Sequence, residues 1–71
     1  MTMYKKGDKV RIRLDTVSPY RGRIGVIDEE PSEDSWGFWY MVKFESKGFI
    51  RHYRFLEQDL SSVEDASKRL N

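Results

Sequence analysis

The chain is 71 residues long, carries a formal net charge of +1 and contains ten aromatic residues but no cysteine. This length predicts a single small domain, and the lack of cysteine excludes both disulfide bridges and thiolate metal sites. No apolar run approaches the roughly 20 residues of a membrane span, and the first residues lack the apolar core of a signal peptide. We therefore expect a protein of the reducing cytoplasm.

The charges are distributed unevenly along the chain. Residues 1–27 contain seven cations and two carboxylates, whereas residues 28–34 contain five carboxylates and no cation. Such an asymmetry bears on the partner and on the orientation of binding rather than on the fold. A solvated surface of mixed charge is the plainer interpretation of the same pattern.

Residues 9–14 are predicted to form the first strand. Val10, Ile12 and Leu14 fall on one face and cations fill the other, which is the two-residue period of a half-buried strand with a basic outer face. A loop follows, because Pro19 disfavours helix at the residue before it and cannot donate a hydrogen bond in a central strand.

Residues 22–29 are predicted to form the second strand. Ile24 and Val26 share one parity, and we expect them to face the core. Gly22 and Gly25 fall within this stretch, where a glycine marks a bulge, a sharp bend or a contact too close for a side chain.

Residues 37–45 are predicted to form the third strand, after an acidic loop at residues 31–35. The even-numbered residues are all apolar and are expected to face the core: Phe38, Tyr40, Val42 and Phe44. This leaves Trp39 and Met41 pointing outward. Paired apolar residues on an exposed strand face often mark a contact surface.

The last third of the chain is predicted to contain a hairpin turn and two more strands. Residues 46–48 fit a tight turn in which Gly48 supplies a positive φ, and a strand follows at residues 49–54 whose buried face the pattern leaves open. Residues 57–59 fit a single 3₁₀ turn and residues 60–63 a short closing strand. The predicted core consists of Val10, Ile12, Leu14, Ile24, Val26, Phe38, Tyr40, Val42, Phe44 and Leu60.

Four stretches carry a resemblance to a known superfold. They are Gly7-Asp8-Lys9-Val10, Gly22-Arg23-Ile24-Gly25-Val26-Ile27, Tyr40-Met41-Val42-Lys43-Phe44 and the ending Tyr53-Arg54-Phe55-Leu56-Glu57-Gln58-Asp59-Leu60. Together they resemble the SH3-like small barrel of KOW type. The resemblance implies an all-β, five-stranded SH3-like barrel over residues 1–64, followed by a frayed tail at residues 65–71. Because many unrelated functions share this superfold, the resemblance does not decide the function.

A narrower resemblance involves Val42-Lys43-Phe44-Glu45, Tyr53-Arg54-Phe55 and Asp59-Leu60. These stretches are similar to the ferredoxin-docking accessory subunits of photosynthetic complexes, namely the E subunit of photosystem I, the variable chain of ferredoxin–thioredoxin reductase and the S subunit of the NDH complex. The chain differs from them in its acidic loop and its two tryptophans. This resemblance implies a docking role within a larger complex.

The sequence offers no catalytic constellation. His52 is the single histidine, and no cysteine or second histidine completes a triad or a metal site. Gly22 and Gly25 lack the third glycine and the following helix of a dinucleotide-binding loop. We therefore expect no enzymatic activity, no cofactor and no metal.

The strongest functional candidate is a basic strand face with nearby aromatic side chains. The cations are Lys9, Arg11, Arg13, Arg21 and Arg23, and the apolar contact residues are Tyr20, Trp36, Trp39 and Met41. Arginine suits bidentate contacts with carboxylate or phosphate. Three interpretations stay open: a plain solvated surface, a docking face for an acidic protein, and a nucleic-acid interface. The near-neutral net charge favours the protein partner over nucleic acid.

Overall fold

The computed structural model describes residues 2–63, which form six β-strands and one 3₁₀ turn. The strands are β1 (Lys9–Ile12), β2 (Ile24–Ile27), β3 (Ser32–Asp34), β4 (Gly37–Ser46), β5 (Phe49–Leu56) and β6 (Leu60–Ser62), and the 3₁₀ turn η1 (Glu57–Asp59) joins the last two. The predicted frayed tail at residues 65–71 lies outside the described residues.

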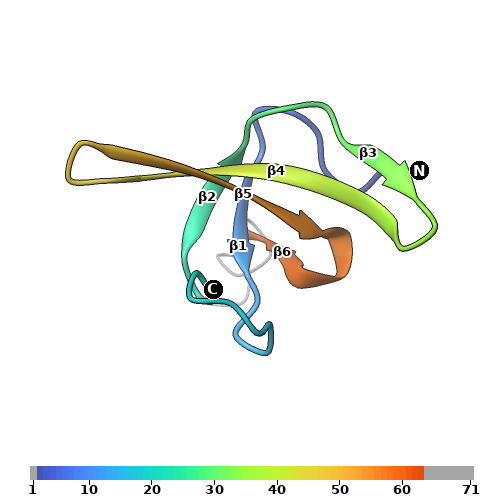
Figure 1. Ribbon diagram of the computed structural model, residues 1–71, viewed down its shortest axis with the longest axis horizontal. Coiled ribbons are helices and arrows are strands. Elements are labelled where there is room, and N and C mark those ends of the chain that lie inside the picture. The colour runs from blue at the N-terminus through green and yellow to red at the C-terminus, as the bar shows by residue number, and fades with distance from the viewer. Residues whose placement is uncertain (1, 64–71) are drawn as a thin grey trace, which may run out of the picture.

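The six strands belong to one curled sheet (Figure 1). Its order is β3, β4, β2, β1 and β6, with β5 paired to β4 as well. Within residues 2–63 no ladder joins β5 to β6, so the sheet is an open half-barrel. The prediction of an all-β fold is confirmed, and the curled sheet is compatible with an SH3-like fold.

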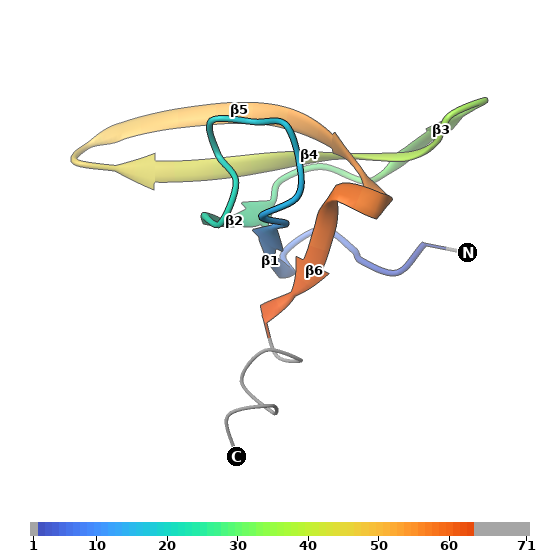
Figure 2. The same ribbon diagram turned by 90° about the horizontal axis from the view of Figure 1, so that it is seen from below.

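β4 is the strand around which the others are arranged. β5 pairs with it from Trp39 opposite Leu56 to Ser46 opposite Phe49. The other edge of β4 is shared, because its first residues pair with β3 and its later residues pair with β2. The tip of the β4–β5 hairpin projects beyond the other strands in both views (Figures 1 and 2).

A single cluster of nine buried side chains forms the core. It consists of Tyr4, Val10, Ile12, Ile27, Tyr40, Val42, Phe44, Phe55 and Leu60. Tyr40, Val42 and Phe44 of β4 face this core as the alternation predicts, with Phe38 partly buried at its margin. Tyr4 is an addition that the polar N-terminal sequence does not predict. Its ring meets the Tyr40 ring edge-on, with centroids 5.6 Å apart.

The predicted parity of β2 is wrong. Gly25 and Ile27 face the core, whereas Ile24 is 47% exposed and Val26 is half-buried. A Cβ on Gly25 would lie 2.5 Å from Val42 Cγ1 and 2.8 Å from a backbone carbonyl oxygen of β4. β2 therefore approaches β4 so closely that its inward position must lack a side chain, and this contact sets the parity of the strand. The prediction that a glycine here marks a close contact is confirmed.

The predicted first strand is two residues too long, and Leu14 lies outside the core with 75% of its surface exposed. β1 ends at Ile12, because the next amide, that of Arg13, donates to the Asp59 carbonyl of η1 at 2.9 Å. Leu14 instead covers Gly22, where an added Cβ would lie 2.9 Å from Leu14 Cδ2.

Part of the predicted acidic loop is a strand. β3 pairs with the start of β4 in a hairpin, and Asp34 holds this hairpin together. Its carboxylate accepts hydrogen bonds from the Trp36 backbone amide and from Trp39 Nε1, both at 2.8 Å.

The predicted tight turn between the last long strands is confirmed. Lys47 and Gly48 connect β4 and β5 with φ angles of 50° and 82°. Two consecutive positive φ angles are typical of the type I′ turn, whose twist matches that of the flanking strands. The predicted 3₁₀ turn and closing strand are also present, as η1 and β6.

Candidate binding groove

The five cations predicted to share one face do not lie together. Lys9 and Arg11 belong to β1 and point away from the core, because Val10 and Ile12 occupy its buried face. The residue opposite Arg11 on β2 is Ile24, not one of the arginines. The predicted convergence is therefore wrong, since Arg21 and Arg23 precede β2 rather than belong to it.

Arg13 is engaged in a local contact. It follows the end of β1 and donates two hydrogen bonds to Asp15, at 3.0 and 2.9 Å. The hydrogen bonds and the opposite charge lower the pKa of the Asp15 carboxyl and raise the pKa of Arg13. Both side chains are exposed, and a surface pair of this kind contributes little to stability.

Arg23 has the parity of Gly25 and Ile27 and therefore lies on the core side of the sheet, at its open margin. Its guanidinium carbon is 5.5 Å from the centroid of the Tyr20 ring and 5.8 Å from that of Phe44. Cation–π contacts of this kind hold the cation in place while its N–H groups stay available to a ligand.

The apolar contact residues predicted from the sequence are also dispersed. Trp36 is 77% exposed at the turn between β3 and β4. Trp39 and Met41 lie on the outer face of β4, where both are half-buried, and the Trp39 indole donates to Asp34. Trp39 and Met41 therefore offer less open apolar surface than the alternation alone indicates. Tyr20 is half-buried and packs against the core.

A groove of about 260 Å³ opens beside Tyr20, next to the turn end of the β4–β5 hairpin. It is lined by Tyr20, Arg23, Phe44, Ser46, Lys47, Phe49 and Arg51, and we call it the basic-aromatic groove. The Tyr20 ring stacks on Phe44 with centroids 4.5 Å apart and contacts the Tyr53 ring at 4.7 Å. Figure 2 shows how the loop before β2, which carries Tyr20, rises to the level of β5. Phe49 and Tyr53 are 64% and 48% exposed, so the groove has open aromatic edges.

Among the described residues, the groove lining contains three cations and no carboxylate. Within residues 2–63, none of Arg23, Lys47 and Arg51 takes part in an ion pair. Arg51 lies over the Phe49 ring, 5.7 Å from its centroid. Burial raises the pKa of the Tyr20 hydroxyl, and the neighbouring Tyr53 hydroxyl raises it further, so Tyr20 stays a neutral donor at neutral pH. The groove is therefore suited to bind anions.

The opposite face of the same hairpin carries charges that offset one another. Asp28 lies 2.9 Å from His52 Nε2 and 4.0 Å from Lys43 Nζ, and Lys43 also lies 3.7 Å from Glu45. Asp28, the first residue of the acidic run, is thus engaged within the fold. The basic-aromatic groove keeps its cations unpaired, whereas this outer face does not.

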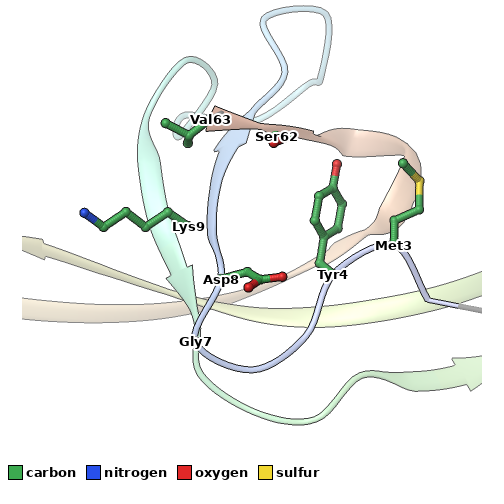
Figure 3. Close-up of a pocket in the computed structure, with 7 residues that line it drawn as sticks. All are labelled: Met3, Tyr4, Gly7, Asp8, Lys9, Ser62 and Val63. Atoms are coloured by element: carbon green, nitrogen blue, oxygen red, sulfur yellow. The ribbon is translucent and has the colours of Figure 1, made fainter. Parts of the chain in front are cut away.

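A second pocket, of about 560 Å³, lies between the N-terminal segment and β6 (Figure 3). It is lined by Met3, Tyr4, Gly7, Asp8, Lys9, Ser62 and Val63. The Lys9 side chain points away from the tyrosine ring, and Asp8 accepts a hydrogen bond from the Lys5 backbone amide at 3.0 Å. Its wall ends at Val63, the last described residue, and we assign no role to this pocket.

The polar groups of the basic-aromatic groove are guanidinium, ammonium and hydroxyl groups, without a carboxylate or imidazole to move a proton at neutral pH. In the described part of the chain, no three histidine, cysteine or acidic side chains gather as they would around a metal ion. The same residues include no helix with the length and apolar character needed to span a membrane.

Sequence reasoning did not single out Lys47, Phe49, Arg51 or Tyr53. The parity of β5 is hard to read, because apolar residues and cations occur on both of its faces. A different signal was available, because residues 46–56 contain three cations and no carboxylate. Comparison with known proteins finds no matching family model, no matching curated protein and no matching solved structure.

Proposed function

We propose that the protein is a non-catalytic binding module that holds an acidic segment of a partner protein in the basic-aromatic groove. The observation that carries this proposal is the groove lining, in which three unpaired cations lie beside exposed aromatic rings and no carboxylate is present. Partner carboxylates would accept charge-assisted hydrogen bonds from Arg23 and Arg51. Partner apolar side chains would cover Phe49 and Tyr53.

The proposal also covers the fold type of the protein, its location in the cell, and the cations that lie outside the groove. The curled sheet and the 3₁₀ turn before its last strand support an SH3-like barrel of KOW type. We propose that this barrel acts in the cytoplasm as an accessory subunit. Lys9, Arg11 and Arg21 lie outside the groove. Of these, Lys9 and Arg11 on the outer face of β1 would raise the rate of association with an acidic partner rather than contact it closely.

Single-stranded RNA is the alternative ligand, favoured by arginine beside aromatic rings. In this groove, however, the rings already contact one another: Tyr20 stacks on Phe44, and Arg51 lies over Phe49. A run of bases needs several open ring faces in a row, and each of these contacts takes up one such face. The arrangement therefore favours a protein ligand over nucleic acid.

Fluorescence anisotropy at physiological salt tests the proposal with three probes: a peptide in which glutamate and valine alternate, the same peptide with lysine in place of glutamate, and random single-stranded RNA. We expect the acidic peptide to bind and the lysine peptide not to bind. Arg51→Gln is expected to weaken acidic-peptide binding about tenfold, since a hydrogen bond to a charged group is lost. Arg21→Gln, an exposed arginine outside the groove, is the matched control and should change it less than about twofold.

Two results would overturn the proposal. One is an affinity for the acidic peptide that Arg51→Gln and Arg21→Gln change equally. The other is submicromolar binding of random single-stranded RNA at physiological salt, which would assign the groove to nucleic acid.

A further inference from the structure

β5 has one edge without a strand partner. It pairs with β4 along Phe49–Leu56, and Figure 2 shows it on the side of β4 away from β2 and β1. Within residues 2–63, no backbone hydrogen bond joins β5 to any segment other than β4. An unpaired edge of this length presents a row of N–H and C=O groups that can pair with another strand.

The pairing of β4 shows which residues of β5 direct their backbone groups outward. The Met41 carbonyl of β4 accepts a hydrogen bond from the Asp28 amide at 2.9 Å, so Met41 turns its backbone groups away from β5. Arg54 lies opposite Met41, and His52 and Ile50 follow at two-residue steps along β5. In an antiparallel ladder, residues alternate between bonding inward and bonding outward. Ile50, His52 and Arg54 therefore offer their N–H and C=O groups at the free edge.

The side chains on both faces of this edge are of similar kinds, namely apolar and cationic. One face of β5 is turned toward the basic-aromatic groove and carries Phe49, Arg51 and Tyr53. The residues between them, which include Ile50 with 53% of its surface exposed, lie on the other face. The edge contains no proline, so every backbone donor is present. A strand laid along β5 would contact apolar and cationic side chains on both of its own faces.

We propose that the acidic segment binds by adding a strand to the free edge of β5, beside the basic-aromatic groove. This inference rests on the proposed function and specifies its binding mode. Charge complementarity identifies the occupant, because residues 46–56 contain Lys47, Arg51 and Arg54 and no carboxylate. A second copy of β5 in the same place would add its own three cations to an edge that already carries three, and this repulsion disfavours self-pairing. The occupant is therefore an extended acidic segment of another protein.

Amide hydrogen exchange, measured by NMR with and without the alternating glutamate–valine peptide, tests the binding mode. In the free protein we expect rapid exchange at Ile50, His52 and Arg54 and slow exchange at Arg51 and Tyr53, whose amides bond to β4. With free peptide at about 100 times its Kd, exchange of the three outward amides should slow about 100-fold. Docking through side chains alone would leave those three amides unprotected.

A pair of variants at one position isolates the backbone contribution. His52→Ala and His52→Pro both remove the contact with Asp28, but only proline removes the outward N–H. We expect His52→Ala to bind the peptide within about twofold of the parent and His52→Pro to bind at least about tenfold more weakly. If His52→Pro fails to fold, the exchange measurement on the parent protein decides the question alone.

The outcomes separate this inference from the proposed function. Absence of any acidic-peptide binding overturns both. Peptide binding that is weakened by Arg51→Gln but leaves the amides of Ile50, His52 and Arg54 unprotected overturns strand addition alone. Protection that appears without peptide and grows with protein concentration would replace the proposed occupant with a second copy of the chain.

Discussion

Gly25 shows how one residue without a side chain sets the course of a strand. A Cβ at this position would lie within 3 Å of both Val42 Cγ1 and a backbone carbonyl oxygen, and the backbone cannot move aside as a flexible side chain would. We expect Gly25→Ala to lower the free energy of unfolding by about 1–3 kcal/mol, the usual cost of overpacking. Urea unfolding followed by tryptophan fluorescence measures this change.

Gly7→Ala is the control for this substitution. Gly7 has a φ of 96° and nothing within 4 Å of an added Cβ, so its replacement carries only the conformational cost of about 1 kcal/mol. A loss at Gly25 no larger than that at Gly7 would contradict the close contact between β2 and β4.

Tyr40 gives the fold a response to alkaline pH. Its fully buried hydroxyl donates a hydrogen bond to Glu57 Oε2, and burial, together with this bond, raises the pKa of Tyr40 to about 12. The tyrosine of the unfolded chain has a pKa of about 10. Between these two values the unfolded chain loses the proton while the folded chain keeps it, so stability falls as pH rises through this window.

We therefore expect the urea midpoint of the parent protein to fall between about pH 10 and about pH 12, and this fall to be smaller in Tyr40→Phe. Tyr53→Phe leaves the Tyr40 hydrogen bond to Glu57 in place, so it should reduce this fall less than Tyr40→Phe does, although it removes the hydroxyl that helps to raise the pKa of Tyr20. An identical alkaline profile in the parent and in Tyr40→Phe would show that the Tyr40 proton does not contribute.

Among the elements, the β4–β5 hairpin depends on its two-residue turn. Lys47 has a φ of 50°, a conformation that costs a lysine free energy and that asparagine adopts more readily. We expect Lys47→Asn to raise the free energy of unfolding by about 0.5–1 kcal/mol. Lys47→Gln removes the same charge without the preference for a positive φ. Equal effects of the two substitutions on the urea midpoint would attribute the gain to charge instead.

The elements differ in how far the sequence determines them. β4 is predicted well, because its even-numbered residues from Phe38 to Phe44 are all apolar and its turn contains Gly48. β2 is predicted with the wrong parity, because Ile24 to Ile27 holds apolar residues on both faces and the deciding contact comes from β4. Alternation within one strand carries no information about how closely a neighbouring strand approaches.

The candidate site depends even more on long-range packing. The sequence identifies Arg23 and Tyr20 as contact residues, and both line the groove. The sequence does not show that Arg23 lies over the Tyr20 ring, or that the loop before β2 reaches β5. The contact between Tyr20 and Tyr53 joins residues 33 positions apart, and the curl of the whole sheet brings them together.

At the scale of the whole molecule, one core of nine side chains supports the entire described sheet. Domains of this size bury a modest fraction of their surface and have small net stabilities. A single charge placed in this core therefore acts globally. The same charge placed on the outer face of the sheet meets solvent and neighbouring lysines instead.

Val42 and Val26 provide the matched comparison, since both are valines in neighbouring strands. Val42 is fully buried, so Val42→Asp places a carboxylate in the core without a partner and should unfold the domain. Val26 is half-buried between Lys9 and Lys43, its register partners on either side. A carboxylate there would pair with the lysines, so Val26→Asp should change the free energy of unfolding by no more than about 1 kcal/mol.

Far-UV circular dichroism and the urea midpoint distinguish the two valine variants. We expect Val26→Asp to keep a cooperative transition and Val42→Asp to lose it. In Val26→Asp the stability should also fall with added salt, because screening weakens the new pairs with Lys9 and Lys43. Unfolding of Val26→Asp would instead restore the parity that the sequence alone predicts, with Val26 turned toward the core and Gly25 turned away from it.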